Sequence, residues 1–156
     1  MKDYVERKQH TLEDVKKIIE GLDKKTNMQF SKVEIKVSKR MTSTIAYASM
    51  SISRRKGVIE KIEPVNFTFS YYILQAMLTK EQFEAIVIHE YVHLLTNIKN
   101  KKDCCHNELF VNECLSLGLK KNQATPYCEI ETYFAFSDSI KKYKKNKREF
   151  PLVHTI

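Results

Sequence analysis

The sequence lacks any apolar run that approaches the length of a membrane span, and no apolar signal core follows its charged N-terminal residues. We therefore expect a cytoplasmic protein that does not enter a membrane. The four cysteines include no Cys-x-x-Cys pair, and in a cytoplasmic setting an even number does not indicate disulfide bonds. Cys104 and Cys105 are therefore expected to be free thiols. The Pro-Cys-x-x-Cys pattern of nucleobase deaminases is also missing, which argues against that class of zinc enzyme.

Positive charge is in excess, and most of that excess lies near the C-terminus. The 27 basic and 19 acidic residues give a net charge of +8, and the segment Lys141–Arg148 holds six basic residues and no acid. Subtracting these six leaves 21 basic against 19 acidic residues. Such a segment can bind DNA phosphates without regard to sequence, and Tyr143 within it could stack on a base. A solvated tail is the alternative. We predict one domain, residues 1–140, followed by a basic tail, residues 141–156.

The most informative stretch is His89-Glu90-Tyr91-Val92-His93, in which two histidines four residues apart flank a glutamate. Residues four apart lie on one face of an α-helix, so both imidazoles can reach one metal ion. Catalytic zinc is held by such nitrogen ligands and keeps an open position for water. Glu90 can take the proton of that zinc-bound water as a general base, while the metal polarises a scissile carbonyl. The pattern is typical of zinc peptidases.

The context of the motif also indicates a helix. Thr79 and Gln82 have the spacing of a capping box, and apolar residues recur at helical intervals from Lys80 to Asn97. Ionisable groups on an apolar face are costly to bury unless they are paired or metal-bound, which argues against a chance occurrence of the pattern. By helical phase, Tyr91 points away from the metal-binding face.

Catalytic zinc usually takes a third protein ligand, and the sequence offers two candidates. His106 follows a polar loop and is expected at the start of a second helix that ends before Gly118 and packs on the motif helix. Glu113 lies seven residues after His106, on the same predicted face. It would make a thermolysin-like peptidase, or else accept a hydrogen bond from a ligating histidine. We favour His106 because Phe110 and the Leu117-Gly118 pair accompany it in register.

With these residues the sequence resembles the SprT-like family, zinc metalloprotease-like domains that include a eukaryotic DNA-repair protease. The resemblance covers about residues 28–120 and extends upstream of the motif to the segment from Phe67 to Leu74. It implies that His89, His93 and His106 bind one Zn2+ ion. Glu90 would then be the catalytic base. Many family members also carry a zinc ribbon of paired cysteines; because this chain lacks them, we expect no second structural zinc.

The rest of the chain indicates a small α+β domain. Helical spacing predicts a helix over residues 11–21, ended by Gly21, and alternation predicts strands over residues 30–37, 45–53 and 58–69. A basic turn over residues 53–57 and Pro64 interrupt the last two strands, and a short helix near residues 71–77 precedes the motif helix. Residues from Thr132 onward fit either a strand or a helix.

This order of elements predicts a zincin-like α+β fold, in which a small antiparallel or mixed sheet packs on helices and the motif lies on a central helix. An edge strand of the sheet can then run beside the metal cleft and accept a polypeptide substrate as an added strand.

We therefore predict a zinc-dependent metalloendopeptidase of the SprT-like type, with DNA-associated proteins among the candidate substrates. A catalytically inactive, zinc-stabilised module that binds nucleic acid or protein is the alternative. Tyr127 and Tyr133 are the candidates for a donor to the oxyanion. His10 and His154 lie in charged or terminal segments and are expected to play no part. The sequence does not determine the substrate or the oligomeric state.

Overall fold

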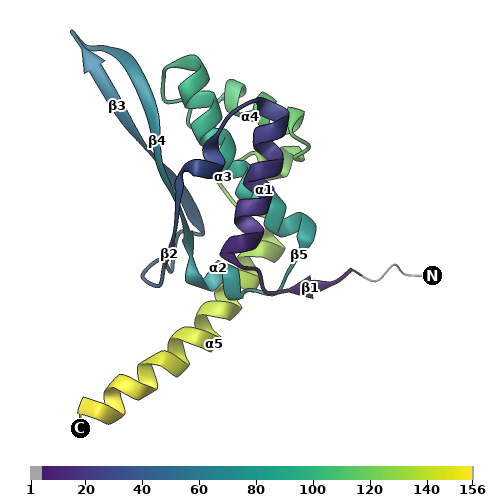
Figure 1. Ribbon diagram of the computed structural model, residues 1–156. Helices are drawn as coiled ribbons and strands as arrows, with labels where there is room; N and C mark the ends of the chain where they lie inside the picture. The colour runs from purple at the N-terminus through teal and green to yellow at the C-terminus, as the bar shows by residue number, and fades with distance from the viewer. Residues whose placement is uncertain (1–4, 156) are drawn as a thin grey trace.

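The computed structural model describes the backbone of residues 5–155 and the side chains of residues 5–144. Its elements follow in the order β1 (Arg7–Lys8), α1 (Leu12–Thr26), the 3-10 turn η1 (Phe30–Lys32), β2 (Glu34–Ser38), β3 (Ala46–Arg55), β4 (Val58–Ser70), α2 (Tyr71–Gln75), β5 (Leu78–Thr79), α3 (Lys80–Asn100), α4 (Glu108–Ser116), the 3-10 turn η2 (Lys121–Gln123) and α5 (Ile130–Thr155) (Figure 1). The predicted α+β class is confirmed. No described helix is both long and apolar enough to span a bilayer.

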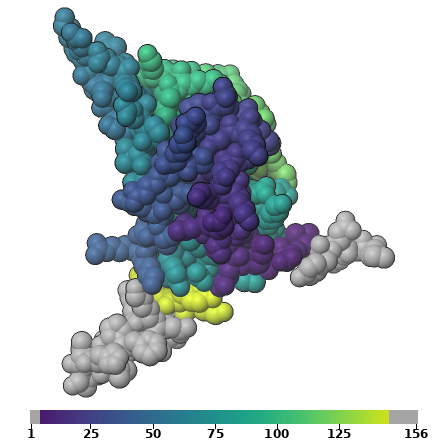
Figure 2. Space-filling model, viewed as in Figure 1, coloured from purple at the N-terminus to yellow at the C-terminus, as the bar shows by residue number. Residues whose placement is uncertain are grey.

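The main sheet is small and mixed. Its strand order is β2-β4-β3, with β2 parallel and β3 antiparallel to β4, and β1 pairs separately with β5. Strand β2 pairs only with residues 66–70 of β4, so the distal halves of β3 and β4 form a two-stranded ribbon that projects from the body (Figures 1 and 2). The predicted basic turn is shorter than expected, because β3 continues to Arg55. Lys56 and Gly57 form the turn with φ of 52° and 80°, as two-residue hairpin turns require.

Pro64 does not interrupt its strand. It lies within β4 opposite Met50, beside a shift of register between Ser49 and Met50. Proline lacks the N–H that a regular ladder needs, and an irregularity of this kind is where a strand can accommodate it.

Helix α1 begins one residue after the predicted start, with Thr11 as its N-cap, and does not end at Gly21. Thr11 and Asp14 exchange hydrogen bonds in a capping box, and the helix continues to Thr26 before Asn27 takes a left-handed conformation. A glycine within a helix costs only about 1 kcal/mol. The turn that follows Gly21 buries Leu22 and Asp23, and the Asp23 carboxylate reaches the next segment.

The segment after α1 starts with a tight turn instead of the predicted strand. The Asp23 carboxylate accepts the backbone N–H groups of Phe30 at 3.1 Å and Ser31 at 2.8 Å, which turns the chain over residues 30–32. The strand therefore begins only at Glu34.

Two hydrophobic clusters hold these elements together. The larger lies between α1, α3, α2 and the main sheet, and its fully buried members include Val15, Ile19, Phe67, Phe69, Ile73, Phe83, Val87, Tyr91 and Leu94. The smaller lies where α3 packs on α4 and η2, and its members are Ala85, Val92, Phe110, Cys114, Leu119 and Ala124. Helix α3 thus contributes to both clusters.

The C-terminal segment, which the sequence left open between strand and helix, forms α5. This helix runs across the predicted boundary at residue 140 into the basic segment. Tyr143 is held against the body of the fold, since its hydroxyl accepts a hydrogen bond from Gln9 Nε2 at 2.7 Å and its ring packs edge-on against Tyr71. The side chains of Lys145, Lys147, Arg148 and His154 lie outside the described residues.

Candidate metal centre

Helix α3 carries the histidine–glutamate motif. The predicted capping box is present: Gln82 N–H donates to Thr79 Oγ1, and the Gln82 side chain accepts from Thr79 N–H. The helix extends three residues past the predicted end. One turn separates His89 from His93, and their ring centroids lie 5.0 Å apart on one face.

His106 reaches this face from a loop, just before the helix on which it was expected. Helix α4 begins at Glu108, and its N-cap is Asn107, whose side chain accepts the Phe110 N–H. The loop is pinned to α3 because Cys104 N–H donates to Asn97 Oδ1 at 2.8 Å. This contact places His106, two residues after Cys104, beside the two histidines of α3.

The three imidazoles converge on one point. Their ligand nitrogens lie within 4.8 Å of one another, and the Nε2 atoms of His89 and His106 are 3.2 Å apart. Two nitrogen ligands of a tetrahedral zinc ion, each about 2.0–2.1 Å from the metal, lie roughly 3.3 Å apart. The group could therefore hold a metal ion.

The protonation of His89 also suits a metal ligand. Its Nδ1 lies 3.0 Å from the carbonyl oxygen of Gln123. A carbonyl can only accept, so Nδ1 carries the hydrogen and the lone pair of Nε2 faces His106. A hydrogen bond of this kind fixes the orientation of a metal-binding imidazole.

Phe110 forms the floor beneath the three imidazoles. Its fully buried ring has centroid distances of 5.0, 4.5 and 4.9 Å to the rings of His89, His93 and His106. Helix α4, which carries Phe110, ends as predicted before Gly118, whose φ of 97° lets Leu119 N–H return to the Cys114 carbonyl.

Burial keeps the imidazoles in their neutral, metal-binding form. Loss of solvation lowers the pKa of His93 to about 3, with a further contribution from the neighbouring histidines. Loss of solvation likewise lowers the pKa of His89 and His106. All three nitrogens can therefore bind a metal at neutral pH without first releasing a proton.

Glu90 is buried beside this cluster, with 9% of its surface exposed. Its carboxylate has no hydrogen bond or ion pair with any described residue, and burial raises its pKa to about 8. A carboxyl group with its pKa near the working pH, at the wall of a cavity, is suited to general base chemistry.

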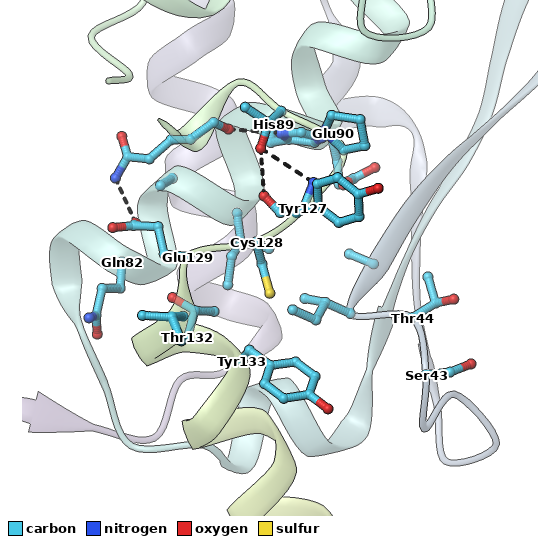
Figure 3. Close-up of a pocket in the computed structure, with 18 residues that line it drawn as sticks. Ser43, Thr44, Gln82, His89, Glu90, Tyr127, Cys128, Glu129, Thr132 and Tyr133 are labelled. Atoms are coloured by element: carbon cyan, nitrogen blue, oxygen red, sulfur yellow. Dashed lines mark hydrogen bonds between the residues drawn. The ribbon is translucent and has the colours of Figure 1, made fainter. Parts of the chain in front are cut away.

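Glu90 and His89 line a cavity of about 590 Å³. Its other walls are the segment before β3, the first turns of α3, and the loop that leads into α5. Figure 3 shows Tyr127 next to His89 and Glu90, and Tyr133 at the opposite end of the cavity. Both candidate oxyanion donors thus lie at the cavity.

A comparison with protein families agrees with this geometry. The model of the SprT-like family matches residues 15–133, which is more than half of the chain. The chain belongs to the SprT-like family. The match extends beyond the predicted range of resemblance at both ends. No curated protein and no solved structure matches the sequence. A metalloprotease-like domain is the expectation for a member of the SprT-like family.

The structure does not bring Glu113 to the metal-binding position in this SprT-like domain. Its carboxylate lies 2.9 Å from Lys99 Nζ and accepts a hydrogen bond from Ser116 Oγ. Among the described residues, only the three histidines form a group that could hold a metal. Neither role predicted for Glu113, metal ligand or acceptor for a ligating histidine, is supported.

Other candidate residues also lie apart from the cluster. As predicted, Tyr91 points away, and its hydroxyl donates to Asp23 Oδ1 at 2.7 Å. His10 is outside the cluster too: it follows an exposed charged segment, but its own side chain is buried and stacked on Phe83. Cys104 and Cys105 are free thiols, as predicted. The thiol of Cys105 lies 3.7 Å from His106 Nδ1, the ring nitrogen that is not part of the cluster.

Proposed function

We propose that the protein is a zinc-dependent metalloendopeptidase, in which His89, His93 and His106 hold the metal. Glu90 is the catalytic base. The observation that carries the proposal is the meeting of three neutral imidazoles beside an unpaired, buried carboxyl group that lines a cavity together with one of them, His89.

The donor set fits zinc better than a hard cation. Three imidazole nitrogens suit zinc, whereas magnesium and calcium prefer oxygen ligands. Three protein ligands with an adjacent cavity also match a catalytic site, because a structural zinc site is closed by four. Zinc bound there would polarise the scissile carbonyl, acidify a water molecule and favour the ionised form of Glu90.

The side chains around the cavity then have separate tasks. Glu90 accepts the proton of the attacking water and delivers it to the leaving amine. The carbonyl of Gln123 keeps the His89 ring in place, and Phe110 supports all three rings from below. Tyr127 and Tyr133 are the candidates to donate a hydrogen bond to the oxyanion.

The arrangement is consistent with a zincin-like mode of substrate binding. Strand β3 is at one end of the main sheet, and the residues that lead into it, 43–46, line the cavity. An extended polypeptide could bind there by main-chain hydrogen bonds to the strand edge. Such binding places a peptide bond in front of Glu90.

The test combines zinc content with cleavage of an unfolded protein. Purified wild-type protein should contain about one zinc ion per chain and cleave the substrate. Glu90→Gln should keep the zinc and lose cleavage by roughly 10²-fold or more. Glu84→Gln is the matched control, because Glu84 lies on the same helix and pairs with Lys80 outside the site. Wild-type turnover in Glu90→Gln would rule out the mechanism.

A second candidate function, nucleic-acid binding through the basic segment Lys141–Arg148, is favoured by the exposed Lys141 and Lys142 on α5. Deleting the segment would remove Tyr143, which packs on the body, so charge reversal is the cleaner test. Lys141→Glu with Lys142→Glu should weaken binding of a DNA duplex and reduce its dependence on salt. Unchanged affinity and salt dependence would exclude this contact.

A further inference from the structure

Three large apolar side chains are unusually exposed around the cavity. Tyr127 is 81%, Ile130 68% and Tyr133 54% exposed, and all three line it. Scattered exposed apolar residues are ordinary, but a group of them around one cavity marks a binding surface. Ile130 and Tyr133 are three residues apart on the first turn of α5, so their side chains lie on the same face of that helix.

The opposite walls of the cavity are also largely apolar. Ile45 and Ala46 come from the start of β3, and Ala85 and Ile86 come from α3. Figure 3 shows Ser43 and Thr44 across the cavity from Tyr133. A side chain that enters from solvent would therefore be enclosed between α5, α3 and the start of β3.

The described side chains that line the cavity offer no positive charge to an anionic occupant. Its charged lining residues are Glu90 and Glu129, and no lysine or arginine is among the described residues that line it. Glu129 already accepts a hydrogen bond from Gln123 Nε2 at 2.9 Å. Beside Glu129 an acidic side chain would meet a carboxylate with no lysine or arginine next to it, whereas an apolar side chain would be desolvated at no such cost.

We propose that Ile130 and Tyr133 form a subsite that binds a large apolar side chain of an extended polypeptide. The inference rests on the proposed peptidase function and names its substrate class: unfolded segments with an aromatic or large aliphatic residue close to the scissile bond. Folded proteins bury such residues, so the subsite selects polypeptides that have lost their tertiary structure.

Peptide binding to the zinc-loaded Glu90→Gln protein tests the subsite without relying on turnover. The probes are fluorescent peptides of one sequence that carry Phe, Ser or Asp at a single position, which is moved along the peptide. At one position Phe should bind roughly tenfold more tightly than Ser, and Asp more weakly than both. Equal affinity of Phe and Ser peptides at every position would overturn the proposal.

Variants then locate the preference. Tyr133→Ala and Ile130→Ser, made in the Glu90→Gln protein, should each remove most of the preference for Phe. Phe134→Ala is the matched control, because Phe134 is 57% exposed on the same helix but does not line the cavity. Tyr133→Phe should keep the preference, since the ring remains. An equal loss in Phe134→Ala, or no loss in Tyr133→Ala, would refute the assignment.

Cleavage by the protein with Glu90 intact separates this proposal from the peptidase function. Preferential binding of Phe peptides without cleavage by a zinc-loaded protein would leave the subsite standing and remove the peptidase. Cleavage with no preference among the three peptides would do the reverse. If Tyr133→Phe lowers kcat while the preference for Phe persists, its hydroxyl has a separate role at the oxyanion.

Discussion

The two faces of α3 bury polar side chains in different ways. On one face, the Tyr91 hydroxyl is fully buried, donates to Asp23 and lies 2.6 Å from Thr26 Oγ1. On the other face, Glu90 is buried with no described partner, beside imidazoles whose Nε2 atoms face one another. Burying a polar group without a partner is costly. The Tyr91 hydroxyl is paired within the chain, whereas the Glu90 carboxylate lies at the cavity without a described partner.

The pKa values of the two faces differ in meaning for the same reason. Burial, with Asp23 nearby, raises the pKa of Tyr91 further above its ordinary alkaline value, so the hydroxyl stays a neutral donor. Burial raises the pKa of Glu90 to about 8, so this group can change its charge at working pH. The Tyr91 hydroxyl therefore stays neutral at working pH, whereas Glu90 can gain or lose a proton there.

The largest expected effect is the loss of zinc when one imidazole is removed beside the Glu90 face of α3. His106→Ala should reduce zinc from about one ion per chain to near zero, measured by elemental analysis after gel filtration. Cys105→Ser is the matched control: its exposed thiol is adjacent in sequence but faces only Nδ1 of His106, so zinc should remain. Full zinc occupancy in His106→Ala would show that the histidine is not a ligand.

A substitution on the Tyr91 face should lower the stability of the protein and leave its zinc content unchanged. Tyr91→Phe leaves the Asp23 carboxylate without its 2.7 Å hydrogen bond and should lower the free energy of unfolding by about 1–3 kcal/mol. Urea unfolding measures this change. Tyr47→Phe, which removes an exposed hydroxyl from β3, is the control and should cost almost nothing. Zinc loss in Tyr91→Phe would break the distinction between the faces.

The motif face was predictable from the sequence because it depends only on helical periodicity and local capping. Residues four apart share a face in any helix, and the Thr79 capping box lies within one turn. The position of Glu113 was not predictable in this way. Its spacing of seven from His106 gives a common face only if one helix spans both, and α4 starts at Glu108, after His106.

The remaining features depend on contacts between distant segments. His106 is positioned by the contact of Cys104 with Asn97, and the turn at Phe30 by the carboxylate of Asp23. Gln123 orients His89 through its carbonyl, a group that every residue has. No pattern of side chains can therefore reveal that contact.

A smaller effect is expected from the pH dependence of stability in the metal-free protein. The folded pKa of Glu90, about 8, exceeds its ordinary value of 4.5. Its contribution to stability is therefore full below pH 4.5 and is lost as the pH rises through 8. Between pH 7 and 8.5 the free energy of unfolding should fall by about 1 kcal/mol more in wild type than in Glu90→Gln.

Between pH 7 and 8.5 the pH dependence of stability reports on Glu90 and not on the histidines. The lowered pKa values of His89 and His93 cost stability only as the pH falls below their ordinary value of 6.5. Urea unfolding with a chelator present, at several pH values, measures both slopes. Parallel curves for wild type and Glu90→Gln would mean that Glu90 is ionised in the fold without metal.

The smallest effect is expected at Glu113, which offers a second carboxylate for comparison with Glu90. Partial burial raises the pKa of Glu113, but its hydrogen bonds from Lys99 and Ser116 and the charge of Lys99 together lower that pKa below its ordinary value. Because the Lys99 side chain is largely exposed, Glu113→Gln should lower the free energy of unfolding by about 1 kcal/mol or less and leave zinc unchanged. Zinc analysis and urea unfolding of the same preparation check both expectations. Loss of zinc here would place the Glu113 carboxylate among the ligands. It would contradict the distinction between Glu113, which is paired within the chain, and Glu90, which has no described partner.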